Sequence, residues 1–289
     1  QLGYIPIISA NKKLSPDSMI DLEWAYRLDR SYKGDSLEEH HEKLYRGWLR
    51  YSTQFIEARL GLQKVSFGPA QVLRPLAWFD TIDPEDPTAQ PDGVEAFRLR
   101  FFPANSFSLW TWIMKGESDT LSYGGRGELS TNLGEWGLTL HQSPDESNTQ
   151  VGVDFRYDGL LGLWFEGAGS ISENQNIDED RHTLMTLGAD YTFPLGAGLL
   201  IMSETMRIKE WSSKTDFSST RTMSSIMAGL PIGMFHNFML IANIDWDENN
   251  TYNYLRWSSI YDHFSINCMV TIDPNSDVNS LELMFIYNH

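Results

Sequence analysis

The chain has 289 residues, enough for one large domain or two small ones, and 13% of them are aromatic. No apolar run approaches the length of a membrane-spanning helix, which excludes a helical membrane protein. The net charge of -17 disfavours nucleic acid as a partner, and the single cysteine, Cys268, argues against a disulfide scaffold.

Residues 1–17 have no clean periodicity. We interpret them as an N-terminal periplasmic segment that packs locally or plugs, followed by a single domain over residues 18–289. Because the chain starts at Gln1 rather than Met, its N-terminus is typical of a mature protein from which a signal peptide has been removed.

A period of two residues begins at Met19 and repeats to the end of the chain. In the first such stretch, Leu22 and Trp24 share one face while Asp21 and Glu23 share the other. The pattern predicts roughly sixteen strands. They cover residues 19–28, 45–51, 55–67, 94–102, 106–114, 120–130, 135–143, 150–157, 161–170, 182–193, 198–209, 222–230, 235–246, 251–260, 264–273 and 281–288.

The connections between these strands are of two kinds. Every second one is short and rich in Pro, Gly, Asn or Asp, whereas most others are longer and acidic. Aromatic residues such as Phe193 and Phe235 collect beside the short turns, as in an interfacial girdle. These features predict an all-β fold: a closed antiparallel transmembrane β-barrel with short periplasmic turns and longer acidic extracellular loops in a bacterial outer membrane.

The apolar face of each strand must then meet lipid, and Cys268 becomes an inert lipid-facing residue. The charged face must point into the lumen. The lumen-lining residues that we single out are Arg46, Arg50, Glu57, Arg59, Arg98, Arg100 and Arg126, and Glu166, Asp190, Glu204 and Arg256 share their inward parity. Arginines from neighbouring strands indicate either an anion-attracting ladder or a structural ion-pair network with Glu57, Asp21 and Glu23.

A loop at residues 68–93 is too long and too aromatic for a simple connection. It can fold inward, with its acids against the arginines, and constrict the pore; the alternatives are a lid over the mouth or a contact with a partner protein. Its candidate residues are Arg74, Trp78, Asp80, Asp83, Glu85 and Asp86.

The sequence around this loop carries a family resemblance. Residues 59–63 read RLGLQ, followed by Phe67-Gly68, then IDPEDP at 82–87 and GVEAFRLR at 93–100. This order resembles a signature of poorly characterised bacterial outer-membrane porin-like barrels, in which an R-x-G-x-Q strand precedes Trp-Gly, a D-P-x-D-P loop and a G-x-x-A-L-R strand. Phe67 replaces the usual Trp. The resemblance covers about 45 residues and implies a barrel with a pore, without a known substrate.

Enzyme and metal motifs are sparse, and we expect no catalytic residue, metal or cofactor. The pair His40-His41 with Glu42 is interpreted as a solvated loop, and the acids at 83–86 and 178–180 are a weak Ca²⁺ possibility without EF-hand spacing. The run His141-Gln142-Ser143 is similar to the H-x-S of outer-membrane phospholipases, but its parity places His141 and Ser143 on the lumen side, away from lipid.

The sequence therefore predicts a porin-like channel, not an enzyme, for passive diffusion of small hydrophilic solutes, anions among them. A non-conducting barrel that serves as scaffold or conduit in a larger outer-membrane complex is the alternative, and a lipid hydrolase is a remote one. Expected partners are the lipid bilayer, small solutes, and further copies of the chain or other outer-membrane subunits.

Overall fold

The computed structural model describes residues 2–33, 36–86, 88, 91–116, 120–143, 148–173, 179–213, 217–273 and 279–287. This part contains eighteen strands: β1 (Leu2–Tyr4), β2 (Ile7–Ser15), β3 (Ser18–Lys33), β4 (Ser36–Thr53), β5 (Ile56–Gln63), β6 (Val94–Ala104), β7 (Phe107–Lys115), β8 (Leu121–Thr131), β9 (Gly134–Ser143), β10 (Asn148–Asp158), β11 (Gly162–Glu173), β12 (Glu179–Phe193), β13 (Leu199–Ser212), β14 (Phe217–Ile232), β15 (His236–Asp245), β16 (Asn250–Ile260), β17 (Phe264–Ile272) and β18 (Ser280–Tyr287). Within these residues no helix has the length and apolar character needed to cross a membrane.

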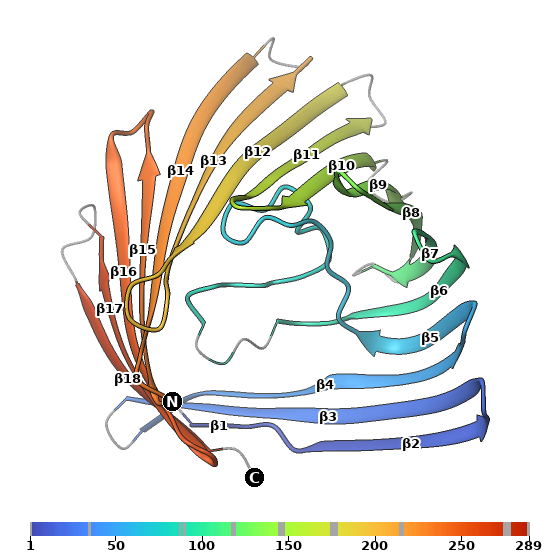
Figure 1. Ribbon diagram of the computed structural model, residues 1–289, viewed down its shortest axis with the longest axis horizontal. Coiled ribbons are helices and arrows are strands. Elements are labelled where there is room, and N and C mark those ends of the chain that lie inside the picture. Colours follow the sequence, from blue (N-terminus) through green and yellow to red (C-terminus); the bar gives the residue numbers. More distant parts are fainter. Residues whose placement is uncertain are drawn as a thin grey trace.

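All the pairings between strands are antiparallel, and consecutive strands from β2 to β18 are hydrogen-bonded neighbours in one sheet that curls around a central space (Figure 1). The all-β antiparallel prediction is confirmed. Among the described residues, no paired positions connect β18 with β1 or β2.

The expected strand count of sixteen was too low, because the N-terminal segment also contributes strands. Leu2 pairs with Arg30 and Ile7 pairs with Ala25, so β1 and β2 cover successive halves of the same edge of β3. Backbone hydrogen bonding in a ladder needs no alternation of side chains, which explains why the aperiodic segment gave no strand signal.

Two predicted element ends also differ from the structure. Within the polar stretch at 29–42, residues 29–33 continue β3 and residues 36–42 begin β4, with Asp29 opposite His41, so the His40-His41 pair lies in a strand instead of a loop. In contrast, β5 stops at Gln63, four residues before the predicted end at 67, because Val65 and Phe67 are buried in an apolar cluster under the sheet.

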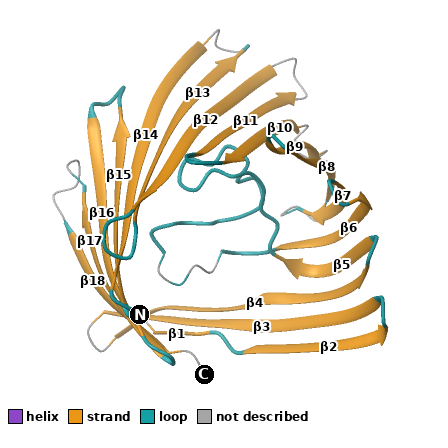
Figure 2. Cartoon of the chain, viewed as in Figure 1, coloured by secondary structure: helices purple, strands orange, loops and turns teal. Residues whose placement is uncertain are grey.

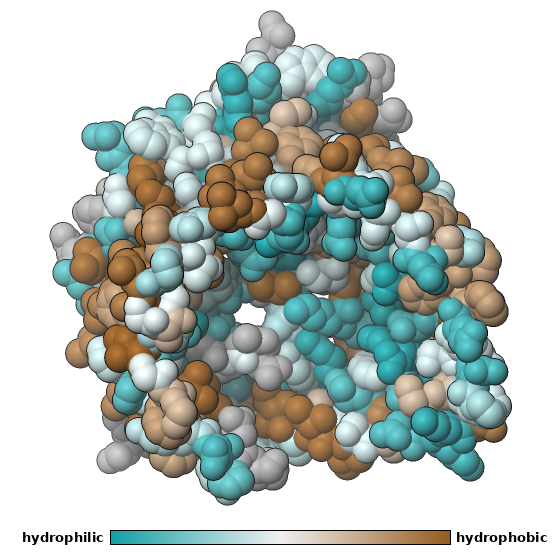
Figure 3. Space-filling model, in the orientation of Figure 1, coloured by the Kyte–Doolittle hydropathy of each residue, from teal (hydrophilic) through white to brown (hydrophobic). Residues whose placement is uncertain are grey.

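Side-chain exposure is inverted relative to a water-soluble sheet. On β9, Leu138 and Leu140 are 54% and 51% exposed, whereas Thr139 and His141, which alternate with them, are buried. The convex face of the curl is therefore apolar and the concave face polar, and Figure 3 shows hydrophilic side chains around the central hollow. This distribution agrees with the predicted parity of the strands.

Candidate functional site

The concave space holds the connection between β5 and β6, which we call the inner loop (residues 64–93; Figure 2). Its apolar side chains pack against the wall: Val65 and Leu76 are fully buried beside Trp112 and Met114. Gly152 on β10 makes this approach possible, because a Cβ there would lie 2.2 Å from Leu76 Cδ2. The inner loop thus has its own small hydrophobic core inside the curled sheet.

Two buried glutamates of the wall fix the backbone of the inner loop. Glu204 on β13 accepts hydrogen bonds from the N–H groups of Gln71 (2.7 Å), Val72 (3.0 Å) and Leu73 (2.7 Å). Trp164 Nε1 donates a further bond of 3.1 Å to the same carboxylate. Converging N–H groups stabilise a carboxylate much as they do an anion in a backbone nest.

Glu166 on β11 holds the same loop at two more points. Its carboxylate accepts the N–H of Ala70 at 3.0 Å and that of Leu76 at 2.6 Å. Gly68 has φ +81°, and a Cβ at this residue would lie 2.1 Å from Glu166 Oε2. Only glycine combines this backbone conformation with so close an approach.

The far tip and the return of the inner loop contact other strands. Tyr252 on β16 donates a 2.8 Å hydrogen bond to the Glu85 carboxylate, and Tyr254 donates one of 2.5 Å to the Glu85 carbonyl. On the return, Tyr45 and Arg46 of β4 donate to the Pro91 carbonyl at 3.0 and 2.5 Å. The loop therefore spans the interior from β4 to β16.

In the part of the chain that the structure describes, no hydrogen bond or ion pair joins a carboxylate of the inner loop to the arginines predicted to line the lumen. Asp80 pairs with Arg74 of the same loop, and Asp83 and Asp86 cap turns by accepting the N–H groups of Glu85 and Thr88 at 2.8 Å. The expectation that these acids face the arginines is therefore wrong, because backbone donors and Arg74 satisfy them locally. Trp78 and Phe79 pack around His141.

Burial and hydrogen bonding shift the pKa values of two of these loop acids, Asp80 and Glu85. Burial opposes the charge of Asp80, but hydrogen bonding and the positive charge of Arg74 outweigh it and hold the pKa of Asp80 below its usual range. Burial raises the pKa of Glu85, and the bond from Tyr252 only partly offsets that effect.

Five of the six predicted arginines, all except Arg46, lie together on the concave face of β4, β5, β6 and β8, in a zigzag of alternating charge. Glu57 is the centre of its first half, at 3.2 Å from Arg98 and 3.6 Å from both Arg50 and Arg59. Arg50 also pairs with Asp21 at 2.9 Å. Within ion-pair distance these three arginines share two carboxylates, and Glu23, on the same face of β3 as Asp21, is a further negative charge near Arg59. Arg46 stands apart from this zigzag, since its described hydrogen bonds go to Tyr45 and Pro91.

The second half of the zigzag is more nearly neutral. Arg100 contacts Glu128 at 3.0 Å, and Arg126 contacts Glu128 at 2.9 Å and Asp154 at 2.6 Å. Indole rings support both halves: the Arg59 guanidinium lies 4.4 Å from the Trp48 ring, and that of Arg100 lies 4.1 Å from the Trp110 ring. Stacking of this kind keeps long side chains extended along the wall.

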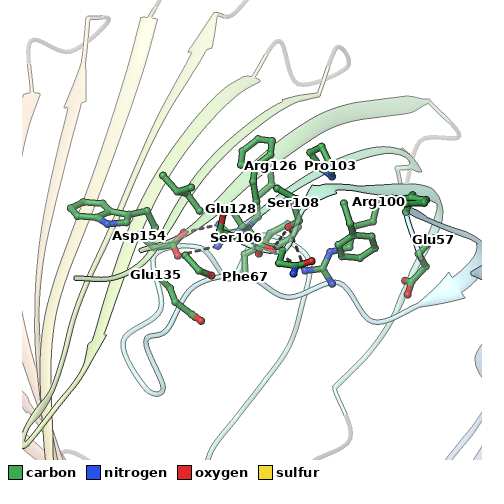
Figure 4. Close-up of a pocket in the computed structure, with 18 of the residues that line it drawn as sticks. Glu57, Phe67, Arg100, Pro103, Ser106, Ser108, Arg126, Glu128, Glu135 and Asp154 are labelled. Atoms are coloured by element: carbon green, nitrogen blue, oxygen red, sulfur yellow. Dashed lines mark hydrogen bonds and ion pairs between the residues drawn. The ribbon is translucent and has the colours of Figure 1, made fainter. Parts of the chain in front are cut away.

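A cavity of about 1030 Å³ opens beside this second half, at the end of the sheet where the short turns lie. Figure 4 shows Arg126 between Glu128 and Asp154, with Arg100 beside Ser108 and Phe67 of the inner loop nearby. The charged residues that line the cavity are Glu57, Arg100, Arg126, Glu128, Glu135, Asp154 and Arg156. It offers both signs of charge and several hydroxyl groups to a hydrophilic molecule of modest size.

The remaining sequence motifs lie outside this cavity. His141 is buried, and its Nδ1 accepts a 3.2 Å hydrogen bond from Trp112, while the Phe79 ring lies 4.7 Å away. Among the described residues no group of three or more His, Cys, Asp or Glu side chains could hold a metal ion. Asp178 lies outside the described residues.

Sequence reasoning missed the anchoring role of Glu166, Glu204, Tyr252 and Tyr254. Parity placed the two glutamates in the lumen, but no local pattern connects them with a loop about a hundred residues away.

Comparison with solved structures identifies the fold. The chain is similar to Vibrio cholerae OmpT, an outer membrane protein (8% identity, TM-score 0.61, covering 98% of this chain and 87% of that one). It is also similar to Pseudomonas aeruginosa OccD3 (10%, TM-score 0.63, 99% and 85%) and to Salmonella typhi OmpF in complex with daunomycin (9%, TM-score 0.51, 93% and 82%). No family model and no curated protein matches the sequence. The chain thus has the fold of bacterial outer-membrane β-barrel proteins.

Proposed function

We propose that the protein is a channel of the bacterial outer membrane that closes as a barrel in lipid and lets small hydrophilic solutes diffuse through its lumen. The proposal rests above all on the charged zigzag and the 1030 Å³ cavity beside it, inside a sheet whose convex face is apolar. A solute that leaves water needs replacement partners for its hydrogen bonds, and this wall supplies donors and acceptors along its length.

The same wall favours anionic solutes. Around Glu57 the three guanidinium groups of Arg50, Arg59 and Arg98 are shared between two carboxylates, Glu57 and Asp21. Guanidinium groups that line a narrow, low-dielectric passage raise the local concentration of anions. The inner loop, held by Glu166 and Glu204, would act as the constriction.

Reconstitution in planar bilayers tests the proposal. Discrete conductance steps with a reversal potential that favours anions in a salt gradient are expected. Absence of conductance from correctly folded protein would refute it.

A non-conducting barrel that acts as scaffold or conduit in a larger complex is the second candidate. It is favoured by the apolar cluster of Val65, Leu76 and Trp112, which fills part of the interior. Co-purification from native membranes separates the two proposals, since a simple pore should be isolated alone or with copies of itself.

A lipid hydrolase that uses Ser143 is the remote alternative. It is disfavoured because Trp112, and not a catalytic partner, occupies His141 Nδ1. Ser143→Ala should therefore leave any residual lipase activity of the preparation unchanged, whereas loss of activity would favour the hydrolase.

A further inference from the structure

The convex face of β13 departs from the apolar pattern of its neighbours. Ile201, near the short-turn end, is followed at the same parity by Ser203, Thr205, Arg207 and Lys209, and all five are exposed. We define Arg207, Lys209 and Arg181, which lies on the adjacent convex face of β12, as the outer basic patch.

Across the described strands, the residues opposite Arg207 and Lys209 carry no negative charge. In the register of the sheet, Arg207 faces Met185 and Thr222, and Lys209 faces Thr183 and Thr220. Within the described part of the chain, no carboxylate lies within ion-pair distance of Arg207 or Lys209; Glu210, next along β13, has the opposite parity and lies 3.5 Å from His182. A local cationic surface is notable on a chain with net charge -17.

The height of the patch matches the edge of a bilayer. A tilted strand gains roughly 2.5 Å of height per residue, so Arg207 and Lys209 stand about 20 and 25 Å from Leu199, where the apolar band of an outer-membrane barrel, about 25 Å tall, ends. Two tryptophans accompany them: Arg181 lies 5.3 Å from the Trp211 ring, and Trp246 donates a 2.9 Å hydrogen bond to Ser224 on β14. Indole rings prefer the lipid headgroup level.

We propose that the outer basic patch binds the phosphate of an anionic lipid headgroup, with the acyl chains lying along Ile201 and the apolar face below. Arginine and lysine side chains at the membrane surface attract anionic headgroups. Each such side chain raises the affinity for the anionic lipid by about fivefold. This inference needs the protein to lie in a membrane but does not depend on its being a channel.

Native mass spectrometry of the full-length protein in detergent, titrated with phosphatidylglycerol or with phosphatidylcholine, tests the proposal. Wild-type protein should bind the first phosphatidylglycerol more tightly than phosphatidylcholine. The variant R207Q/K209Q should lose on the order of twenty-fold in phosphatidylglycerol affinity with little change for phosphatidylcholine.

Two matched controls accompany the double variant. The charge-preserving exchange R207K/K209R should keep the preference. The variant K115Q, which removes an exposed charge on β7, six strands away from β13, should keep it as well. Equal binding of the two lipids by wild-type protein overturns the proposal, as does an unchanged preference in R207Q/K209Q. A shift in oligomeric state without a change in lipid binding assigns the surface to a second copy of the chain and also overturns it. Conductance of R207Q/K209Q should equal that of wild type, which keeps this test separate from that of the channel.

Discussion

The Glu204 carboxylate lies against the backbone of Leu73, whose N–H donates a 2.7 Å hydrogen bond to Oε2 across the interior of the sheet. The carbonyl of the same residue accepts a 2.8 Å bond from Thr186 on the adjacent strand β12. Both bonds involve only the main chain of the loop. At this point the wall therefore holds the main chain of the inner loop through Glu204 and Thr186, in addition to the packing of the loop side chains Val65 and Leu76.

Glu204→Gln should loosen the inner loop. The neutral amide keeps the volume but weakens the bonds to Gln71, Val72 and Leu73, each worth about 1.5–3 kcal/mol when the acceptor is charged. We expect faster amide hydrogen exchange at residues 70–76. We also expect larger fluctuations of the current through the open channel. Glu210→Gln, a change at an exposed acid on the same strand and of the same parity, should affect neither. Equal exchange in both variants would contradict the anchoring role.

Gly68→Ala should displace the loop from Glu166. The new methyl group would meet the carboxylate at 2.1 Å and would also suffer the strain of φ +81°. Gly196→Ala is a matched control, because this glycine has φ +60° but nothing within 4 Å of its Cβ position. We expect Gly68→Ala to increase protease cleavage within residues 64–93, whereas similar cleavage of both variants would mean that the contact with Glu166 is unimportant.

Neutralising Glu57 should make the lumen more selective for anions. Its carboxylate is shared by Arg50, Arg59 and Arg98, so Glu57→Gln removes the one carboxylate that lies within ion-pair distance of all three. In a salt gradient the reversal potential should move towards that of the anion. Glu95→Gln serves as control, since Glu95 is exposed on the convex face beside Leu62. A shift of the same size in the control would show that the overall charge, and not the zigzag, sets selectivity.

The pair of Arg74 and Asp80 should make the inner loop resistant to mild acid. Because the pKa of Asp80 is lowered in the folded loop, its contribution to stability is fully present above the ordinary aspartate range and is lost only as pH falls through the lowered pKa. Hydrogen exchange of residues 74–82 should therefore stay slow from neutral pH to below that ordinary range. Asp80→Asn should exchange faster at neutral pH and lack this acid-dependent step; an acid-dependent step of equal size in the variant would assign the titration to another group.

The strand pattern of this fold was predictable because lipid and lumen impose opposite requirements on alternate side chains. Leu138, Thr139, Leu140 and His141 could be assigned to opposite faces from the sequence alone, and the structure places them there. Where no such contrast acts, the prediction failed: the polar residues 29–33 and 36–42 extend two strands whose backbone ladder continues beyond the apolar band.

The interior was predictable only in part. Parity brought Arg50, Glu57, Arg59 and Arg98 to one wall, as observed. The partners of Glu166 and Glu204 could not be foreseen, because backbone N–H groups leave no trace in a sequence and the contact joins segments far apart in the chain. The same holds for the loop acids, whose nearest donors proved to be local.

Single-channel recording of wild-type protein beside a variant in which residues 70–90 are replaced by a short Gly-Ser linker tests the central proposal most directly. The inner loop crosses the lumen from β4 to β16, so its removal should widen the passage. We predict discrete anion-favouring conductance from the wild type and a several-fold larger conductance from the variant. If both proteins are folded and neither conducts ions, the proposal that the protein is a channel is contradicted.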